Sequence, residues 1–193
     1  MYLGRQQYEN LKEEFDKDYL PFDYGFLKIV TERIKSRSPP YLSFRELWQI
    51  DYWKNGPRNY GKIKRNSEDK IVTVTKNALS ITHQDVKCSI NMLVELEGVG
   101  IPVASAILFF AFPEKFVVID KYVWNAYRKI TKNEPIDNWE SPFTGNAREY
   151  EKLLTFCQNE AKELGWTPRD VEKALFKYGE NKGKIPDFST DNW

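Results

Sequence analysis

The chain has 193 residues, of which 41% are hydrophobic and 15% aromatic, so it can bury one large core or two small lobes that share one. Its net charge of +1 does not by itself indicate a nucleic-acid binder. No apolar run approaches the roughly 20 residues of a membrane span, and the polar start does not read as a signal peptide. We therefore expect a cytoplasmic protein without a membrane segment.

Cysteine and histidine usage limits the metal chemistry open to the chain. Cys88 and Cys157 are far apart, and two cysteines cannot supply a four-cysteine iron–sulfur cluster. His83 is the single histidine, which excludes a histidine-rich site. We expect no metal held by side chains, and we expect both cysteines to be buried or partly buried thiols.

Two amphipathic helices are predicted before residue 40, over residues 6–18 and 23–37, because apolar residues recur there at three- and four-residue spacing. We expect Pro21 to end the first helix, since proline has no N–H to donate and clashes with the preceding turn. Asp23 is the expected cap of the second helix.

Two more helices are expected between residues 43 and 79. Ser43 and Glu46 have the spacing of a capping box, which opens a helix that extends to Trp53. A basic linker or short helix follows over residues 58–65. The segment 67–79 contains a β-branched run that would also suit a strand, but its helical spacing favours a helix.

The stretch 89–128 organises the rest of the chain. It holds two short apolar helices, the first capped by Thr82, joined by a turn at Gly98 and Gly100. Glycine tolerates the left-handed backbone that a tight reversal needs, and Pro102 suits the first turn of the second helix. Such a turn presents backbone N–H groups that bind a phosphate without reading base sequence. An ordinary helix pair with a glycine cap is the alternative interpretation.

An apolar run over residues 116–119 follows the hairpin and ends at Asp120, which is the expected N-cap of a helix over 121–130. The run is too short to build a sheet alone. An irregular connection and two more helices, over 146–164 and 168–178, complete the predicted fold. We expect the last residues, 179–193, to be extended or frayed. Because the remaining segments are predicted as helices, the predicted fold class is all-α.

The hairpin and the aspartate that follows it resemble the helix-hairpin-helix base-excision DNA glycosylase superfamily, which includes endonuclease III, the adenine glycosylase and the 8-oxoguanine glycosylase. The resemblance covers mainly residues 93–128. The pattern apolar-x-Gly-apolar-Gly-x-x-x-Ala is met by Leu96, Gly98, Val99, Gly100 and Ala104. The resemblance implies one two-lobed helical domain over 1–193, with a hairpin lobe around 67–131 and a second lobe built from the chain's two ends.

That resemblance also implies a DNA-repair hydrolase that binds double-stranded DNA. Asp120 matches the family's catalytic aspartate, which would assist base release by orienting a water or by stabilising positive charge on the sugar. The hairpin carbonyls would hold a monovalent cation. The residues expected to contact DNA are Gly98, Val99, Gly100, Ile101, Lys54 and Arg58, and for Lys54 and Arg58 a solvated basic surface is the alternative. The aromatic candidates for a base pocket are Trp53, Tyr122 and Trp124, for each of which a core position is the alternative.

Two departures from the family pattern bear on activity. Pro102 occupies the position where bifunctional members carry a Schiff-base lysine, and Tyr122 replaces a histidine often found two residues after the aspartate. The resemblance therefore implies a monofunctional DNA N-glycosylase. The alternative is a non-catalytic DNA-binding module that keeps the glycosylase fold, and a helical protein-interaction domain is a third reading.

Overall fold

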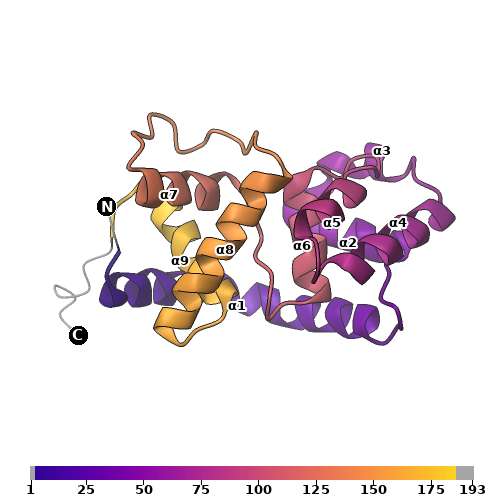
Figure 1. Ribbon diagram of the computed structural model, residues 1–193, viewed down its shortest axis with the longest axis horizontal. Coiled ribbons are helices and arrows are strands. Elements are labelled where there is room, and N and C mark those ends of the chain that lie inside the picture. Colours follow the sequence, from indigo (N-terminus) through magenta and orange to yellow (C-terminus); the bar gives the residue numbers. More distant parts are fainter. Residues whose placement is uncertain (1–2, 186–193) are drawn as a thin grey trace.

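The computed structural model describes residues 3–185, with side-chain placements for all of them except residues 20–24 and 26. Within residues 3–185 the regular elements are helices and no strand is present (Figure 1), which confirms the all-α prediction. None of these helices is both long and apolar enough to cross a lipid bilayer. In chain order they are α1 (Arg5–Lys35), α2 (Phe44–Asn55), the 3-10 turn η1 (Gly56–Asn59), α3 (Tyr60–Ile63), α4 (Glu68–Ile81), α5 (Val86–Leu93), α6 (Ile101–Ala111), α7 (Lys121–Lys132), α8 (Ala147–Leu164) and α9 (Pro168–Glu180).

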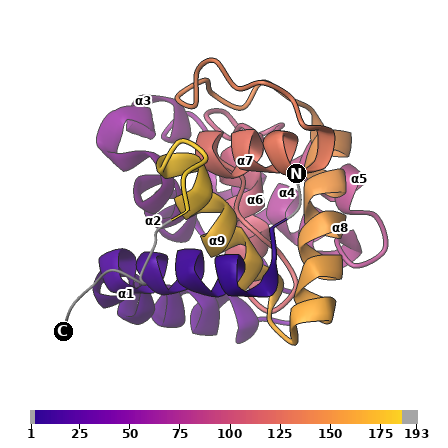
Figure 2. The same cartoon turned by 90° about the vertical axis from the view of Figure 1, so that its left-hand side faces the viewer.

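The helices form two groups that share the long helix α1 (Figures 1 and 2). One group contains α2 to α6, and the other contains α7, α8 and α9. Helix α1 packs on α9 in the second group and on α6 in the first, and α5 packs on α8 across the division. The predicted hairpin lobe, around residues 67–131, would include α7. In the structure α7 packs on α9, next to the helices of the chain's C-terminal part.

The prediction that Pro21 ends a helix is wrong, because α1 continues through it from Arg5 to Lys35. Asp23 therefore does not begin a helix, and its side chain lies outside the described residues. A proline inside a helix costs about 3 kcal/mol, but each large apolar side chain that becomes buried contributes roughly 1.5–3 kcal/mol. The buried apolar residues on both sides of the proline are Tyr8, Leu11, Phe15, Val30 and Ile34.

The capping box at Ser43 correctly located the start of α2. The helices expected over residues 67–79, 146–164 and 168–178 are present as α4, α8 and α9, with Ser67, Asn146 and Thr167 as their N-caps. The expected cap at Thr82 is wrong. Thr82 follows the last residue of α4, and Asp85 instead caps α5 by accepting the Cys88 N–H at 2.8 Å. The chain needs the intervening turn to reverse from α4 to α5, so the extended residue that begins the new helix lies three positions later. The last helix, α9, runs to Glu180, and residues 186–193 lie outside the described part.

An ion pair ties the end of α1 to the start of α2. Two guanidinium nitrogens of Arg37 donate to the two carboxylate oxygens of Glu46, at 2.7 and 2.8 Å, and Glu46 Oε2 also accepts the Ser43 N–H. Burial raises the pKa of Glu46, but the hydrogen bonds from Arg37 and Ser43 outweigh it and leave the pKa below its ordinary value of 4.5. The pair therefore positions α2 relative to α1 and favours the charged carboxylate.

We expect Glu46→Gln to lower the free energy of unfolding by roughly 3 kcal/mol at pH 7, because it leaves the Arg37 guanidinium without its buried partner. A carboxylate with a lowered folded-state pKa stabilises the fold above the unfolded pKa and loses this contribution as the pH falls through the folded-state pKa. The difference between wild type and variant in urea denaturation should therefore shrink below about pH 4.5. Glu32→Gln, at an exposed ion pair with Lys28, is the control and should change stability by less than about 0.5 kcal/mol. A Glu46→Gln effect of that small size would contradict the assigned role.

Candidate functional site

The hairpin predicted from the glycines is present as α5, a tight turn and α6. Gly98 has a φ of +83°, in the left-handed region, and Gly100 is the N-cap of α6 with Pro102 in its first turn. The Val99 N–H donates to the Leu96 carbonyl within the turn. The first N–H groups of a helix have no acceptor inside it, so the start of α6 offers backbone donors to a ligand.

Side chains from the α2–α4 segment hold this turn in place. Asn59 Nδ2 donates to the Gly98 carbonyl at 2.7 Å and to Asp51 Oδ1 at 2.9 Å. Asn66 makes a paired contact with the backbone of Glu97, donating to its carbonyl and accepting its N–H, both at 2.9 Å. These amides fix the hairpin against the loop that follows α2.

The monovalent cation implied for the hairpin carbonyls does not fit these contacts. The carbonyls of Glu97 and Gly98 already accept side-chain amides, and the ammonium of Lys70 donates to the Glu95 carbonyl at 3.0 Å. A positive charge already bound to the turn opposes a second cation there.

A groove of about 700 Å³ runs between the hairpin and the segment that follows α2. Its walls combine the hairpin residues Gly98 and Gly100 with Lys54, Arg58 and Lys62. Arg58 and Lys62 are exposed. Exposed cations beside backbone N–H donors are the features that bind phosphates of a nucleic-acid strand.

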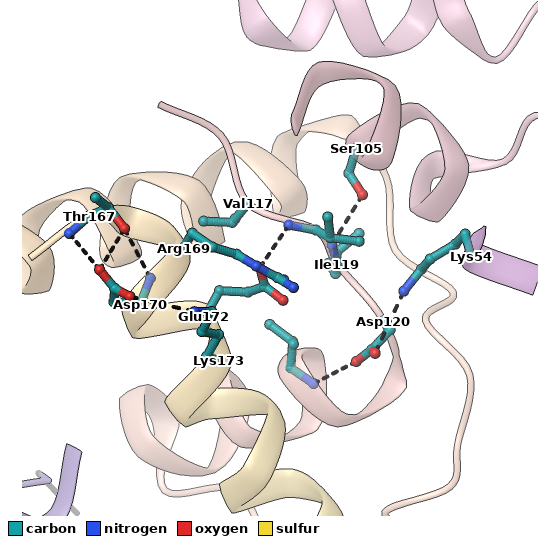
Figure 3. Close-up of polar contacts among 12 residues, drawn as sticks. Lys54, Ser105, Val117, Ile119, Asp120, Thr167, Arg169, Asp170, Glu172 and Lys173 are labelled. Atoms are coloured by element: carbon teal, nitrogen blue, oxygen red, sulfur yellow. Dashed lines mark hydrogen bonds and ion pairs between the residues drawn. The ribbon is translucent and has the colours of Figure 1, made fainter. Parts of the chain in front are cut away.

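Asp120 lies at the start of α7, as predicted, and its carboxylate makes two contacts (Figure 3). Its Oδ1 atom accepts the Val123 N–H at 2.9 Å, which is the N-cap hydrogen bond. Its Oδ2 atom lies 3.6 Å from Nζ of Lys54 on α2. The side chains are 20% and 12% exposed respectively, so the ion pair is largely but not completely removed from solvent.

The backbone before Asp120 is extended without belonging to a sheet. Its polar groups are satisfied by buried side chains from three helices: Ser105 Oγ accepts the Ile119 N–H at 3.1 Å, Glu172 Oε2 accepts the Val118 N–H at 3.3 Å, and the Tyr150 hydroxyl donates to the Val117 carbonyl at 2.9 Å. Buried backbone groups need such partners, and here they also fix the position of the aspartate. Figure 3 shows the Ser105 and Glu172 contacts.

Asp120 and Lys54 line a cavity of about 220 Å³ whose remaining walls come from α1, α2, α9 and the extended segment before Asp120. Its polar residues are Lys54, Asp120, Arg169 and Glu172. Its apolar lining consists of Phe15, Tyr19, Trp53, Val118 and Phe176. A cavity with aromatic walls and a few converging polar groups is typical of a binding site for a small planar group.

Arg169 and Glu172 form an ion pair at one side of this cavity. The Arg169 guanidinium also lies over the ring of Phe109, 4.9 Å from its centroid. Burial raises the pKa of Glu172, and the nearby Asp120 raises it further, against the opposing effect of Arg169. The cavity thus carries cationic donors and a carboxyl group that is harder to ionise than usual.

A family model described as "Putative 8-oxoguanine DNA glycosylase OGG-like protein" matches residues 44–176, which is more than half of the chain. The chain belongs to this OGG-like family. No match was found among curated proteins or among solved structures. The matched segment begins with the first residue of α2 and ends within α9, so it contains the hairpin, Lys54, Asp120 and the Arg169–Glu172 pair.

The structure of this OGG-like protein brings together some of the predicted site residues. Lys54 and Trp53 lie in the lining of the Asp120 cavity. Tyr122 lies outside that lining; its hydroxyl donates to Glu140 and its ring meets the edge of Phe176. Trp124 is buried and packs on other rings of its own group of helices, as its core alternative anticipated.

Sequence reasoning missed the walls of the cavity from α1 and α9. Phe15 and Tyr19 are four residues apart on α1, and Arg169 and Glu172 are three residues apart on α9. These spacings place each pair on one face of its helix, so the sequence could have indicated that each pair acts together. Nothing in the spacing indicates that the two helix faces meet at Asp120.

The two hairpin glycines should respond differently to alanine. A Cβ atom at Gly98 would lie 2.9 Å from Lys62 Cβ, in a backbone with positive φ, whereas at Gly100 its nearest neighbour would be 3.7 Å away. We expect Gly98→Ala to lower the free energy of unfolding by about 1–3 kcal/mol and Gly100→Ala to change it by less than about 0.5 kcal/mol. Urea denaturation measures both, and equal losses at the two positions would contradict the described turn.

Proposed function

We propose that this OGG-like protein is a DNA N-glycosylase of base excision repair, in the helix-hairpin-helix superfamily, that acts on double-stranded DNA with Asp120 assisting base release. The observation that carries the proposal is the position of Lys54, which lies in the walls of both the hairpin groove and the Asp120 cavity. A strand bound by its phosphates in the groove would therefore present an adjacent sugar to the aspartate.

The cavity requires a nucleotide that has left the duplex. A stacked base cannot reach an enclosed carboxylate, so the target must be flipped out at a cost of a few kcal/mol. The aromatic rings of Phe15, Trp53 and Phe176 offer surfaces against which a base can stack. Contacts of the groove residues with the flanking phosphates would offset the cost of flipping.

The chemistry assigned to Asp120 follows from its charge and position. As the bond between sugar and base breaks, positive charge develops on the sugar, and a fixed carboxylate stabilises it. The same carboxylate can orient a water for attack on C1′. Its hydrogen bond from the Val123 N–H holds the carboxylate in a fixed orientation.

The Arg169–Glu172 pair favours a guanine-derived base. 8-Oxoguanine keeps the O6 acceptor of guanine, which a guanidinium recognises. Its N–H donors on the pairing edge and at N7 match a carboxyl oxygen. This reading agrees with the substrate in the family's description. A panel of duplexes that carry 8-oxoguanine, uracil, mismatched thymine or an alkylated base should show release chiefly of 8-oxoguanine.

The alternative is a DNA-binding module that keeps the fold without catalysis, for which Pro102 and Tyr122 are the supporting residues. The two functions differ in one measurement. Duplex binding without release of any base in the panel would support the module and overturn the glycosylase.

We expect Asp120→Asn to reduce single-turnover base release by at least about 100-fold, because the amide neither carries the charge nor accepts a proton. Asparagine is also a good N-cap, so α7 and duplex affinity should be retained. Asp85→Asn, at the N-cap of α5, is a matched control and should release base at the wild-type rate. Release that survives Asp120→Asn unchanged would remove Asp120 from the mechanism.

The groove prediction is tested separately with Arg58→Gln combined with Lys62→Gln. Loss of two phosphate contacts should weaken duplex binding and reduce the slope of log affinity against log salt by about one per contact. Fluorescence anisotropy at several salt concentrations measures this. Lys28→Gln combined with Lys152→Gln removes the same charge at exposed positions outside the groove and should leave the slope unchanged. Equal slopes in all three proteins would place the DNA elsewhere.

A further inference from the structure

Aromatic rings from α2 and α3 form a cluster outside the site described above. The ring of Trp48 meets those of Tyr52 and Tyr60 edge to face, at centroid distances of 5.4 and 4.7 Å. The ring of Phe44 lies 6.5 Å from that of Tyr60. We call these four residues the aromatic cluster. They take no part in the walls of the hairpin groove or of the Asp120 cavity.

The aromatic cluster is open to solvent at its two tyrosines. Tyr52 is 53% exposed and Tyr60 is 44% exposed, whereas Trp48 and Phe44 are partly buried. Single apolar residues on a surface are ordinary. Two exposed tyrosines that share contact with one tryptophan are different, because together they offer adjoining ring surfaces to a planar ligand.

A stripe of residues along α2 connects the aromatic cluster to the hairpin groove. Arg45, Trp48, Tyr52 and Asn55 follow one another at spacings of three and four residues, which places them on one face of the helix. Asn55, at the end of this stripe, lines the groove. A strand bound by its phosphates in the groove could therefore continue along α2 to the tyrosines.

The charges around the aromatic cluster match a polyanion. The exposed cations near it in the chain are Arg45, Arg58, Lys62, Lys64 and Arg65. The carboxylates of α2 are buried and already accept hydrogen bonds, Glu46 from Arg37 and Asp51 from Asn55 and Asn59.

The exposed carboxylate of Glu68 lies at the far end of the aromatic cluster, where it accepts the Phe44 N–H at 2.9 Å. Negative charge at that end opposes a phosphate. The cluster is therefore more favourable to an anionic strand on the side of Tyr52 and Tyr60, which is also the side nearer to the groove in the chain.

We propose that the aromatic cluster binds unpaired bases of a single DNA strand that continues from a duplex held in the groove. The proposal rests on the proposed function only in taking duplex DNA as the ligand of the groove. Bases inside a duplex are stacked on one another, whereas an unpaired strand can stack its bases on aromatic side chains while cations follow its backbone. Such stacking tolerates any base, so the cluster would select unpaired DNA rather than a sequence.

The test measures the affinity of the full chain for labelled duplexes that differ only at one end. The end is blunt, or it carries about ten thymidines, or it carries as many abasic tetrahydrofuran residues, which is within the roughly 4–16 nucleotides that single-strand sites cover. The last two ends have the same phosphate charge, so their difference in affinity measures the contribution of the bases. Extensions at the 5′ and 3′ ends are measured separately by fluorescence anisotropy. For at least one of them we expect the thymidine end to bind at least about tenfold more tightly than the abasic end.

Tyr52→Ala and Tyr60→Ala should each reduce this preference for bases at least about fivefold, because each removes a stacking surface. Tyr52→Phe keeps a ring and should retain the preference. Ile29→Ala is the control, since it removes an apolar side chain on α1 that is exposed to the same degree, and it should leave the preference unchanged. Affinity for the blunt duplex should be the same in all these proteins, and melting temperatures establish that each is folded.

Photochemical crosslinking locates the bound bases. Thymines of the extension are replaced by 5-iodouracil, the complex is irradiated, and the crosslinked peptide is identified by mass spectrometry. We expect crosslinks at Trp48, Tyr52 or Tyr60. Crosslinks confined to other segments would contradict the proposal. Equal affinity of the wild type for thymidine and abasic ends would also overturn it, and would leave a protein partner as the alternative occupant of the cluster.

Two further measurements separate this proposal from the proposed function. Base release is measured on fully paired duplexes, and affinity is measured for a free thymidine strand and a free abasic strand of equal length. Base release without any preference for bases would leave the glycosylase standing and overturn the role of the aromatic cluster. A preference for the free thymidine strand that is lost in Tyr52→Ala, without base release from any duplex, would support the cluster and overturn the glycosylase.

Discussion

The contact between Lys54 and Asp120 joins the two groups of helices at a residue that lines both the groove and the cavity. Lys54 comes from α2 in the hairpin group, and Asp120 begins α7 in the other group. Neither charge is fully buried, so the pair avoids part of the desolvation cost of an interior ion pair. The rest of the site depends on this approach of α2 to the start of α7.

Three sets of side-chain hydrogen bonds maintain that approach. Arg37 and Glu46 fix the start of α2 against α1, and Asn59 links the segment after α2 to the hairpin turn. On the other side, Ser105 and Glu172 hold the extended residues that lead to Asp120. In each set an amide, hydroxyl or carboxyl side chain makes a hydrogen bond to a charged group or to the backbone. These buried polar side chains therefore fix the positions of α2, the hairpin turn and the segment before Asp120.

The long helix α1 completes the cavity and lies outside the segment that matches the OGG-like family. It supplies Phe15 and Tyr19, and it is bound to α9 by ion pairs such as Lys173–Asp16 and Lys177–Asp18. Burial lowers the pKa of Lys177, but hydrogen bonds from its ammonium to Asp18 and Glu180 outweigh this and raise it. Because α9 also carries Arg169 and Glu172, these charges hold the aromatic and polar walls of the cavity together.

The sequence alone determined the helical class, most helix starts, the glycine turn and the N-cap role of Asp120. These features depend on residues three or four positions apart, and a cap or an amphipathic face is complete within that distance. Only the tertiary structure decided that α1 continues through Pro21, that Lys54 meets Asp120, and that α1 and α9 enclose the aspartate. Those outcomes depend on packing between segments that are distant in the chain. Burial of the apolar faces of α1 outweighs the local effect of Pro21, and the same packing brings Lys54 to Asp120, which no local spacing connects.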